Sequence, residues 1–492
     1  MIDPARHARA RPGAPALVTP AAVWTWAELD ARVGACAARI AAPPRPHLAP
    51  WHAGAAPLAV RARTSPDLVV LVLAALRAGR TLVPLSTRWP APAVADALDR
   101  LGLTSLVADD ADGVPAGLDV TPLADLTRTG RGGAGQGGAH PSRSIPHVPP
   151  RTPFTVVHTS GSTGVPKAAL HTVGNHAASA RGVARHMDLG PDGRWLLDLP
   201  LYHVGGLGVV VRCALVGAAM ALPEPGMALS DAVAALRPTH ASFVSTQLRR
   251  LLDGDPAAAS SLRAVLLGGS AVPAELLDRA AARGVPVATS YGLTEMTSTV
   301  TATAPGPRRP DLATSGVPLD GRELRVSSAG EIEVGGAVLF AGYVTADGLA
   351  PPGEWFATGD LGHVDNRGRL VVTGRRGLMF VSGGENVQPE AVEAALLALD
   401  GVAEAVVVPV PDAAFGHRPA AFVRPAGPAP PDADAIRAAL RRTLPGFMVP
   451  VAVWPWGGAG GMKPDRPALA RVAEGGAASG GAEGPRPSVP SP

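Results

Sequence analysis

His158-Thr-Ser-Gly-Ser-Thr-Gly-Val-Pro-Lys167 is the stretch around which the rest of this sequence can be interpreted. It follows the apolar run 154–157 and combines several hydroxyl side chains with two glycines and a lysine. Glycines let a backbone approach a ligand closely, and hydroxyl, N–H and ammonium groups all donate to phosphate oxygens. In the common NTPase phosphate loop a Ser or Thr follows the lysine, and none follows Lys167. The stretch therefore predicts a phosphate-binding loop of another kind, with an ordinary Ser/Gly surface loop as the alternative.

The bulk composition predicts a globular chain of several domains. The 492 residues suffice for about two to four domains with large cores. The net charge is +3 and the arginines are scattered, so we expect no nucleic-acid partner. The two cysteines, Cys36 and Cys213, have no Cys or His at ligand spacing. We therefore expect neither a disulfide framework nor a zinc site, and a cytoplasmic location.

The longest apolar region, 201–222, contains His203, Arg212 and several glycines. Charged residues are costly inside a bilayer, so we expect a buried strand–helix segment rather than a membrane span. The N-terminus is polar and predicts no signal peptide. A buried arginine needs a partner. Arg212 is then either half of a structural salt bridge or a clamp for a substrate carboxylate.

The order of predicted elements indicates an α/β fold. Ser65-Pro66-Asp67 is a helix start, followed by a helix over 68–78 and a strand over 81–85, which predicts a layered sheet with covering helices. Short β runs at 323–326 and 331–334 predict a small β subdomain. We expect three parts: an N-terminal domain of layered α/β subdomains plus the β subdomain (1–373), a small α+β domain (374–473) and a disordered Gly/Ala/Ser/Pro tail (474–492).

Two further residues are candidates for chemistry. Glu295 lies just beyond a predicted strand at 285–289, at the edge where open α/β sheets bind ligands. A single carboxylate beside phosphate oxygens suits Mg²⁺; a solvated loop acid is the alternative. Lys463 stands on an otherwise neutral loop next to glycines.

Five motifs resemble, in order and spacing, those of the adenylate-forming superfamily of acyl-CoA synthetases, adenylation domains and luciferases. They are Thr159 to Lys167, Tyr291 to Glu295, Thr358 to Asp360, Gly374-Arg375 and Lys463. The resemblance runs from the first helix to about residue 473.

Longer stretches are similar to the o-succinylbenzoate–CoA ligases of menaquinone synthesis. They include Lys167-Ala-Ala-Leu-His-Thr172, Leu199-Pro-Leu-Tyr-His-Val204 and Ser382-Gly-Gly-Glu-Asn-Val-Gln-Pro389.

The resemblance implies ATP, Mg²⁺ and coenzyme A as cofactor and co-substrates of a two-step reaction. A carboxylate attacks the α-phosphorus of ATP to give an acyl-adenylate and pyrophosphate, and the thiol of coenzyme A then displaces AMP. It also implies that the C-terminal domain is mobile, rotating near Gly374-Arg375 between the two steps.

The same resemblance implies roles for individual residues. Lys463 would stabilise the transition state of the first step, Glu295 would hold Mg²⁺, and His203 would line the acyl pocket. For the second, unreactive carboxylate of o-succinylbenzoate our own candidate is Arg212, which has no visible partner in the sequence, with Ser245, Thr246 and Gln247 as supporting polar groups. The nucleotide would be held by Thr159, Ser160, Gly161, Ser162, Thr163, Gly164, Lys167, Gly268, Gly269, Ser270, Ser290, Tyr291, Gly292, Thr294, Asp360 and Arg375.

Three alternatives to an o-succinylbenzoate–CoA ligase remain at this point. They are another aryl- or medium-chain acyl-CoA ligase, a stand-alone adenylation domain that loads a carrier protein, and a non-catalytic nucleotide-binding protein. The expected partners are a small carboxylate, ATP and coenzyme A. The sequence leaves open whether the chain forms a homo-oligomer.

Overall fold

The computed structural model describes residues 2–41, 51, 55–110, 113–128, 148–159, 166–254, 256–269, 272–306, 309–382, 385–412, 415–427, 432–456 and 465–478. The chain divides into two units, each described by itself. The first comprises Met1–Gly268, Ala280–Leu324 and Val334–Phe356. The second comprises Gly269–Arg279, Arg325–Glu333 and Ala357–Pro492.

The first unit contains two large sheets. One has the strand order β15-β14-β13-β12-β11-β9-β10-β1-β2, in which β1, β10, β9, β11, β12 and β13 run parallel. Its strands are β1 (Pro15–Val18), β2 (Val23–Thr25), β9 (Arg194–Leu196), β10 (Ala219–Ala221), β11 (His240–Phe243), β12 (Ala264–Leu267), β13 (Val287–Leu293), β14 (Ser298–Ala302) and β15 (Val317–Pro318).

The other sheet has the order β19-β18-β8-β7-β4-β3-β5-β6. Its strands are β3 (Leu58–Arg61), β4 (Leu82–Pro84), β5 (Ser105–Ala108), β6 (Asp119–Pro122), β7 (Pro153–Thr159), β8 (Lys167–Thr172), β18 (Gly342–Thr345) and β19 (Gly348–Ala350). β7 and β8 form an antiparallel pair, and β18 adds to β8 antiparallel from far along the chain.

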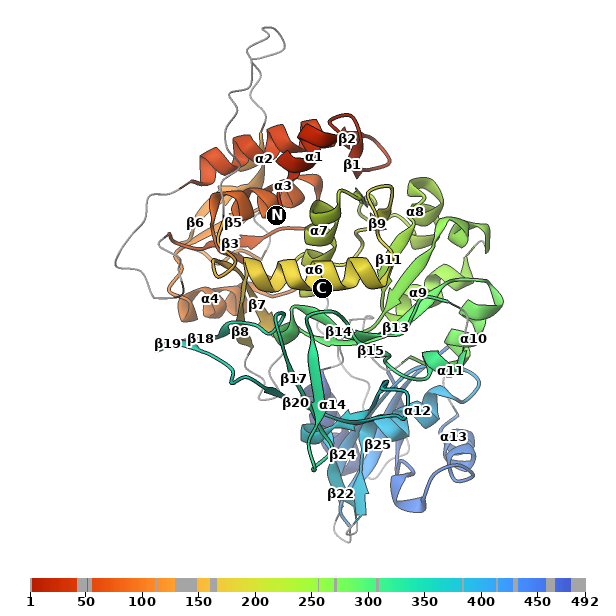
Figure 1. Cartoon of the computed structure of the whole chain (residues 1–492). Coiled ribbons are helices and arrows are strands. Elements are labelled where there is room, and N and C mark those ends of the chain that lie inside the picture. Colours follow the sequence, from red (N-terminus) through yellow and green to blue (C-terminus); the bar gives the residue numbers. More distant parts are fainter. Residues whose placement is uncertain are drawn as a thin grey trace, which may run out of the picture. The chain divides into compact units, whose positions relative to one another are not determined.

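Helices α2 (Trp26–Ile40), α3 (Pro66–Ala78), α6 (Val173–His186) and α7 (Val204–Val216) form one hydrophobic core with both sheets. Figure 1 shows α6 and α7 between the strands β7 and β8 on one side and β9, β11 and β13 on the other. α3 confirms its predicted start and end: the Ser65 hydroxyl accepts from the Leu68 N–H at 3.2 Å, and Gly79 has φ 63°. The layered α/β architecture predicted from the sequence is confirmed.

Several shorter helices precede the C-terminal part of the chain. They are α1 (Pro4–Ala10), α4 (Ala91–Arg100), α5 (Leu123–Thr127), α8 (Leu229–Leu236), α9 (Ser245–Asp253), α10 (Ala274–Ala282) and α11 (Arg309–Leu312), with 3₁₀ turns η1 (Pro256–Ser261), η2 (Thr294–Met296), η3 (Arg376–Leu378) and η4 (Gly446–Met448).

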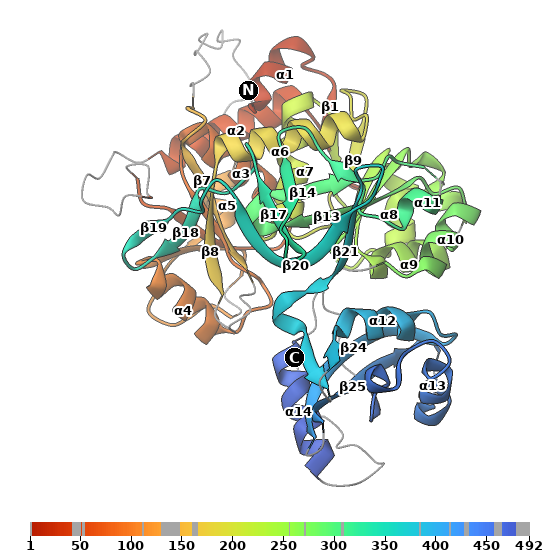
Figure 2. The same cartoon turned by 60° about the horizontal axis from the view of Figure 1, so that its bottom comes forward.

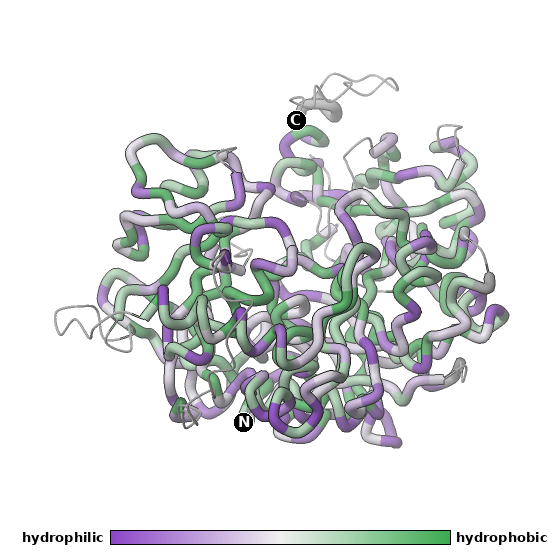
Figure 3. The backbone as a smooth tube through the Cα atoms, turned by 90° about the horizontal axis from the view of Figure 1, so that it is seen from above, coloured by the Kyte–Doolittle hydropathy of each residue, from purple (hydrophilic) through white to green (hydrophobic). Residues whose placement is uncertain are grey.

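Apolar and hydrophilic residues alternate at short intervals along the chain (Figure 3). Accordingly, none of the helices in the described part of the chain has the length and apolar character needed to cross a membrane.

A small antiparallel sheet confirms the predicted β subdomain. Its strands are β16 (Glu323–Val326), β17 (Glu331–Gly335), β20 (Phe356–Val364) and β21 (Leu370–Arg375), in that order.

The second unit carries an α+β layer. The strands are β22 (Phe380–Ser382), β23 (Glu385–Val387), β24 (Val402–Asp412), β25 (Gly416–Pro425) and β26 (Val453–Pro455), and the helices are α12 (Pro389–Leu397), α13 (Ala433–Leu440) and α14 (Arg466–Ala478). Successive side chains of a strand face opposite sides of the sheet. In β24, Val407 packs with α12 and α13, whereas Val406 and Val408 pack with α14. Figure 2 shows these helices on opposite faces of β24 and β25.

The domain boundary at 373/374 and the tail beginning at Glu474 stay predictions. Helix α14 extends to Ala478, and residues 479–492 lie outside the described part of the chain.

Candidate active site

The first group of predicted site residues gathers at the carboxyl edge of the larger sheet. β9, β11, β12 and β13 run parallel, so the residues after them share one edge. The Gln247 amide donates to the Asp198 carboxylate at 2.6 Å, and the Ser290 hydroxyl donates to the Leu267 carbonyl at 3.0 Å. A Cβ on Gly268 would lie 2.7 Å from the Ser290 hydroxyl, so a side chain there would displace that hydroxyl from its present position. The other predicted residues at this edge are Ser245 and Thr246 in α9, and Tyr291, Gly292 and Thr294.

Lys167 and Glu295 are brought together by a residue that the sequence analysis missed. Tyr343 on β18 pairs with Ala169 on β8, two positions after Lys167. The Tyr343 hydroxyl donates to Oε1 of Glu295 at 2.6 Å, and the Lys167 ammonium lies 5.1 Å from the centre of the Tyr343 ring. The chain has only three tyrosines, which was the one available signal, because a partly buried phenol needs a polar partner.

Glu295 meets the requirements of a magnesium ligand shared with phosphate. Mg²⁺ keeps octahedral geometry and binds one or two carboxylates together with substrate oxygens and water. Nowhere in the described ranges do three or more His, Cys, Asp or Glu side chains group as metal ligands. A single carboxylate such as Glu295 could bind Mg²⁺ together with the oxygens of a bound nucleotide.

A hydrogen bond from the buried side chain of His171 holds the backbone next to Glu295. Nε2 of His171 lies 2.7 Å from the Thr294 carbonyl, and Nε2 of His176 lies 2.8 Å from the Thr155 hydroxyl. Burial lowers the pKa of His171 to about 4 and also lowers that of His176 well below its ordinary value. His171 is thus neutral near pH 7, and its Nε2 carries the proton that it donates to Thr294.

We expect stability to fall as the pH is lowered through the range between the unfolded and folded pKa values of His171. The unfolded chain takes up the proton near 6.5, but the folded chain takes it up only near 4. Below pH 6.5 the unfolded state therefore binds more protons, and the loss reaches about 3 kcal/mol by pH 4 for this residue alone. Urea unfolding at pH 7 and pH 5 measures it. His171→Gln, whose amide can still donate, should show a shallower dependence; equal slopes would contradict the assignment.

The second unit holds the predicted ribose-binding pair. Asp360 on β20 pairs in register with Arg375 on β21, and Nε of Arg375 lies 3.5 Å from Oδ1 of Asp360. The Thr358 hydroxyl donates to the Ile332 carbonyl and accepts from the Asp360 N–H at 3.0 Å, which fixes the turn at Gly359 with φ 77°. A carboxylate held in this way can accept from a diol.

Two buried arginines of the first unit have opposite surroundings. Arg322 is 6% exposed and donates five hydrogen bonds. Arg212 on α7 is 1% exposed, and its Nε and Nη1 have no hydrogen-bond partner in the described part of the chain. Its guanidinium lies 4.3 Å from the centre of the Trp195 ring. Burial lowers the pKa of each arginine to about 10, so both are charged near pH 7. Within the described residues, the guanidinium of Arg212 does not form the structural salt bridge that the sequence had left open.

The remaining predicted residues include several outside the described ranges. His203 occupies the N-cap position of α7, is exposed, and has its ring 4.7 Å from that of Tyr202. Gly269 has φ 92° and follows Gly268. Seven positions lie outside the described residues: Ser160, Gly161, Ser162, Thr163, Gly164, Ser270 and Lys463.

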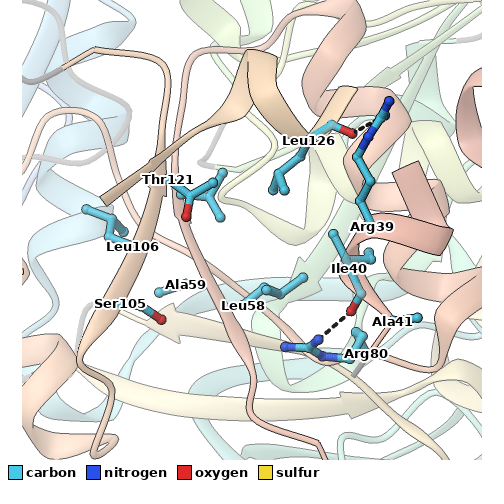
Figure 4. Close-up of a pocket in the computed structure, with 11 residues that line it drawn as sticks. Arg39, Ile40, Ala41, Leu58, Ala59, Arg80, Ser105, Leu106, Thr121 and Leu126 are labelled. Carbon is cyan, nitrogen blue, oxygen red and sulfur yellow. Dashed lines mark hydrogen bonds between the residues drawn. The ribbon is translucent and has the colours of Figure 1, made fainter. Parts of the chain in front are cut away.

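A cavity of about 240 Å³ lies at another edge of the first unit (Figure 4). It is lined by Leu58 and Ser105, the first residues of β3 and β5, and by Arg39 and Arg80. The guanidinium of Arg39 donates to the Leu126 carbonyl, and that of Arg80 donates to the Ile40 carbonyl. The cavity includes none of the predicted site residues.

Comparison with known proteins shows the family to which the chain belongs. The AMP-binding enzyme family matches residues 4–348, and the AMP-binding enzyme C-terminal domain matches residues 391–456. The chain therefore belongs to the AMP-binding enzyme family, as its motifs predicted.

Several individual proteins and solved structures are similar to this chain over most of its length. The 2-succinylbenzoate–CoA ligase of Salmonella typhimurium is 38% identical over 368 residues, covering 74% of this chain and 75% of the relative. A structure of an E. coli MenE variant with bound OSB-AMS superposes with a TM-score of 0.79 at 31% identity, covering 96% of this chain and 98% of that one. The Bacillus subtilis o-succinylbenzoate coenzyme A synthetase in complex with ATP and magnesium gives a TM-score of 0.78 at 26% identity, covering 92% and 95%.

Proposed function

We propose that this chain is an ATP-dependent acid–CoA ligase that converts o-succinylbenzoate into its coenzyme A thioester in menaquinone synthesis. Its relatives carry this activity in their names, and one was solved with ATP and magnesium. The observation that carries the substrate assignment is the buried, charged guanidinium of Arg212, whose Nε and Nη1 have no partner among the described residues.

The first half-reaction brings two anions together, so the chain must neutralise charge and align the reactants. Lys167 would contact the β- and γ-phosphates, and Asp360 with Arg375 would hold the ribose. Glu295 would hold magnesium, which supplies charge neutralisation at the phosphates when it is bound. Lys463 would lie between the attacking carboxylate and the α-phosphate, where negative charge develops in the transition state.

The second half-reaction breaks the bond between the acyl carbon and AMP as the sulfur of coenzyme A attacks. AMP leaves with the electron pair of the broken C–O bond. We propose that domain 374–473 rotates near Gly374-Arg375 between the two steps and withdraws Lys463.

The substrate carries two carboxylates, and the one that does not react needs a cationic partner. A guanidinium donates two parallel hydrogen bonds to a carboxylate. Arg212, with its face against Trp195, is the group that we assign to this carboxylate. Ser245 supports the assignment, because its buried hydroxyl also lacks a hydrogen-bond partner among the described residues.

A coupled pyrophosphate-release assay over a panel of carboxylic acids tests the proposal. We expect o-succinylbenzoate to be turned over with magnesium and coenzyme A, and its analogue without the ring carboxylate to be at least about tenfold poorer in kcat/KM. Equal use of monocarboxylates would favour another aryl- or medium-chain acyl-CoA ligase. Transfer to a carrier protein, but not to free coenzyme A, would favour an adenylation domain.

We further propose a cytoplasmic location and small molecules rather than nucleic acid as partners. Cys36 and Cys213 are both free and fully buried, which suits a reducing compartment. Burial raises the pKa of Cys36 to about 11 and that of Cys213 to about 12. Sedimentation of the purified chain would establish whether it forms a homo-oligomer.

A further inference from the structure

Tyr343 contacts both charged groups that would handle the outer phosphates of ATP. Its hydroxyl donates to Oε1 of Glu295 at 2.6 Å, and its ring centre lies 5.1 Å from the Lys167 ammonium. The ring also has aromatic neighbours: its centre is 4.8 Å from that of Phe340 and 6.5 Å from that of Phe356. One side chain therefore meets a cation on β8 and an anion in η2.

The main chain of Glu295 is already held without Tyr343. The Phe340 N–H donates to the Glu295 carbonyl at 2.8 Å, and His171 donates to the neighbouring Thr294 carbonyl at 2.7 Å. What these bonds leave undetermined is the direction of the Glu295 carboxylate. The Tyr343 hydroxyl supplies that direction, because a charge-assisted hydrogen bond to one oxygen leaves the other oxygen available.

The ring face has a complementary effect on Lys167. A cation over an aromatic face is attracted without losing its own hydrogen-bond donors. Lys167 and Glu295 carry opposite charges, and a direct ion pair between them would occupy the groups that phosphate and magnesium require. Tyr343 instead gives each of the two charges a partner of its own.

We propose that Tyr343 is a positioning residue of the adenylation step, which orients the Glu295 carboxylate for magnesium and holds Lys167 beside the outer phosphates. The proposal rests on the proposed function in one respect only, namely that the chain binds ATP with magnesium. It assigns a role in the first half-reaction and none in the second.

Two substitutions separate the hydroxyl from the ring. Tyr343→Phe keeps the ring under Lys167 and removes only the bond to Glu295. Tyr343→Leu removes both contacts. Phe356→Leu is the matched control, because Phe356 neighbours the rings of Phe340 and Tyr343 but takes no part in the contacts of Tyr343 with Lys167 and Glu295.

The primary measurement is calorimetric binding of ATP with magnesium and with EDTA, without any acyl substrate. For Tyr343→Phe we expect unchanged ATP affinity in EDTA. The increase in ATP affinity that magnesium causes should be about tenfold smaller than in the wild type, which corresponds to the loss of one charge-assisted hydrogen bond. Tyr343→Leu should weaken binding in both conditions, and Phe356→Leu should bind like the wild type in both.

Turnover gives a second readout. Tyr343→Phe should slow pyrophosphate release yet convert presynthesised acyl-adenylate to thioester at the wild-type rate. A wild-type gain from magnesium in Tyr343→Phe, or an equal loss in both half-reactions, would overturn the proposal. Wild-type affinity of Tyr343→Leu in EDTA would overturn the part that concerns Lys167. Because ATP binding is measured without an acid, failure of the wild type on o-succinylbenzoate would sink the proposed function and leave this test intact.

Discussion

Arg212→Met should weaken the binding of o-succinylbenzoate about a hundredfold, because a carboxylate loses a two-pronged, buried cationic partner. The same substitution should make the folded chain slightly more stable. Burial lowers the pKa of Arg212 from 12.5 to about 10, which corresponds to a cost of about 3 kcal/mol for the charged form. The contact with Trp195 recovers about 2 kcal/mol, leaving a net gain of about 1 kcal/mol on substitution. Steady-state KM values and urea unfolding measure the two effects.

Arg322→Met is the matched control for that experiment. Arg322 is also buried but donates five hydrogen bonds, four of them to main-chain carbonyls. Its loss removes five hydrogen bonds from a buried site, so we expect clear destabilisation. An unchanged KM for o-succinylbenzoate in Arg212→Met would show that this arginine does not hold the substrate. Destabilisation of both variants would show that Arg212 is a structural residue.

Lys463→Ala should reduce adenylate formation by about a thousandfold, since in the proposed mechanism it removes a charge that counts most in the transition state. The variant should still convert presynthesised acyl-adenylate to thioester at close to the wild-type rate, because the proposed second step does not use the lysine. Pyrophosphate release and single-turnover thioester formation measure the two halves separately.

The residues that follow Lys463 provide a control variant for this experiment. Asp465 caps α14 by accepting from the Ala468 N–H at 3.0 Å, and Arg466 forms an ion pair with Glu393 at 2.6 Å. Arg466→Met should therefore lower stability and affect both halves. If Lys463→Ala lost both halves to the same extent, its role would be structural rather than catalytic.

The sequence predicted correctly those elements whose ends are determined by residues close to them in the chain. Ser65 and Gly79 mark the two ends of α3 because a cap and a left-handed terminus are encoded within a few residues of each helix end. Glu295 was expected at the ligand-binding edge because it comes just beyond a strand, and the carboxyl ends of parallel strands share one edge.

Tyr343 was missed because its importance depends on a distant pairing. Its partner Glu295 is 48 positions away, and its place beside Lys167 exists only because β18 pairs with β8. No periodicity or spacing in a single sequence reports such a pairing. The surroundings of Arg212 were likewise beyond reach, since two buried arginines look alike in sequence, and only packing distinguishes the satisfied one from the one without partners.

The two buried cysteines have a consequence for an enzyme that would work beside a reactive thiol. Exchange with a disulfide requires an accessible thiolate, and burial raises the pKa of Cys36 to about 11 and that of Cys213 to about 12. Both side chains are 0% exposed. Oxidised coenzyme A should therefore leave the folded chain unmodified, and turnover should not depend on added reductant.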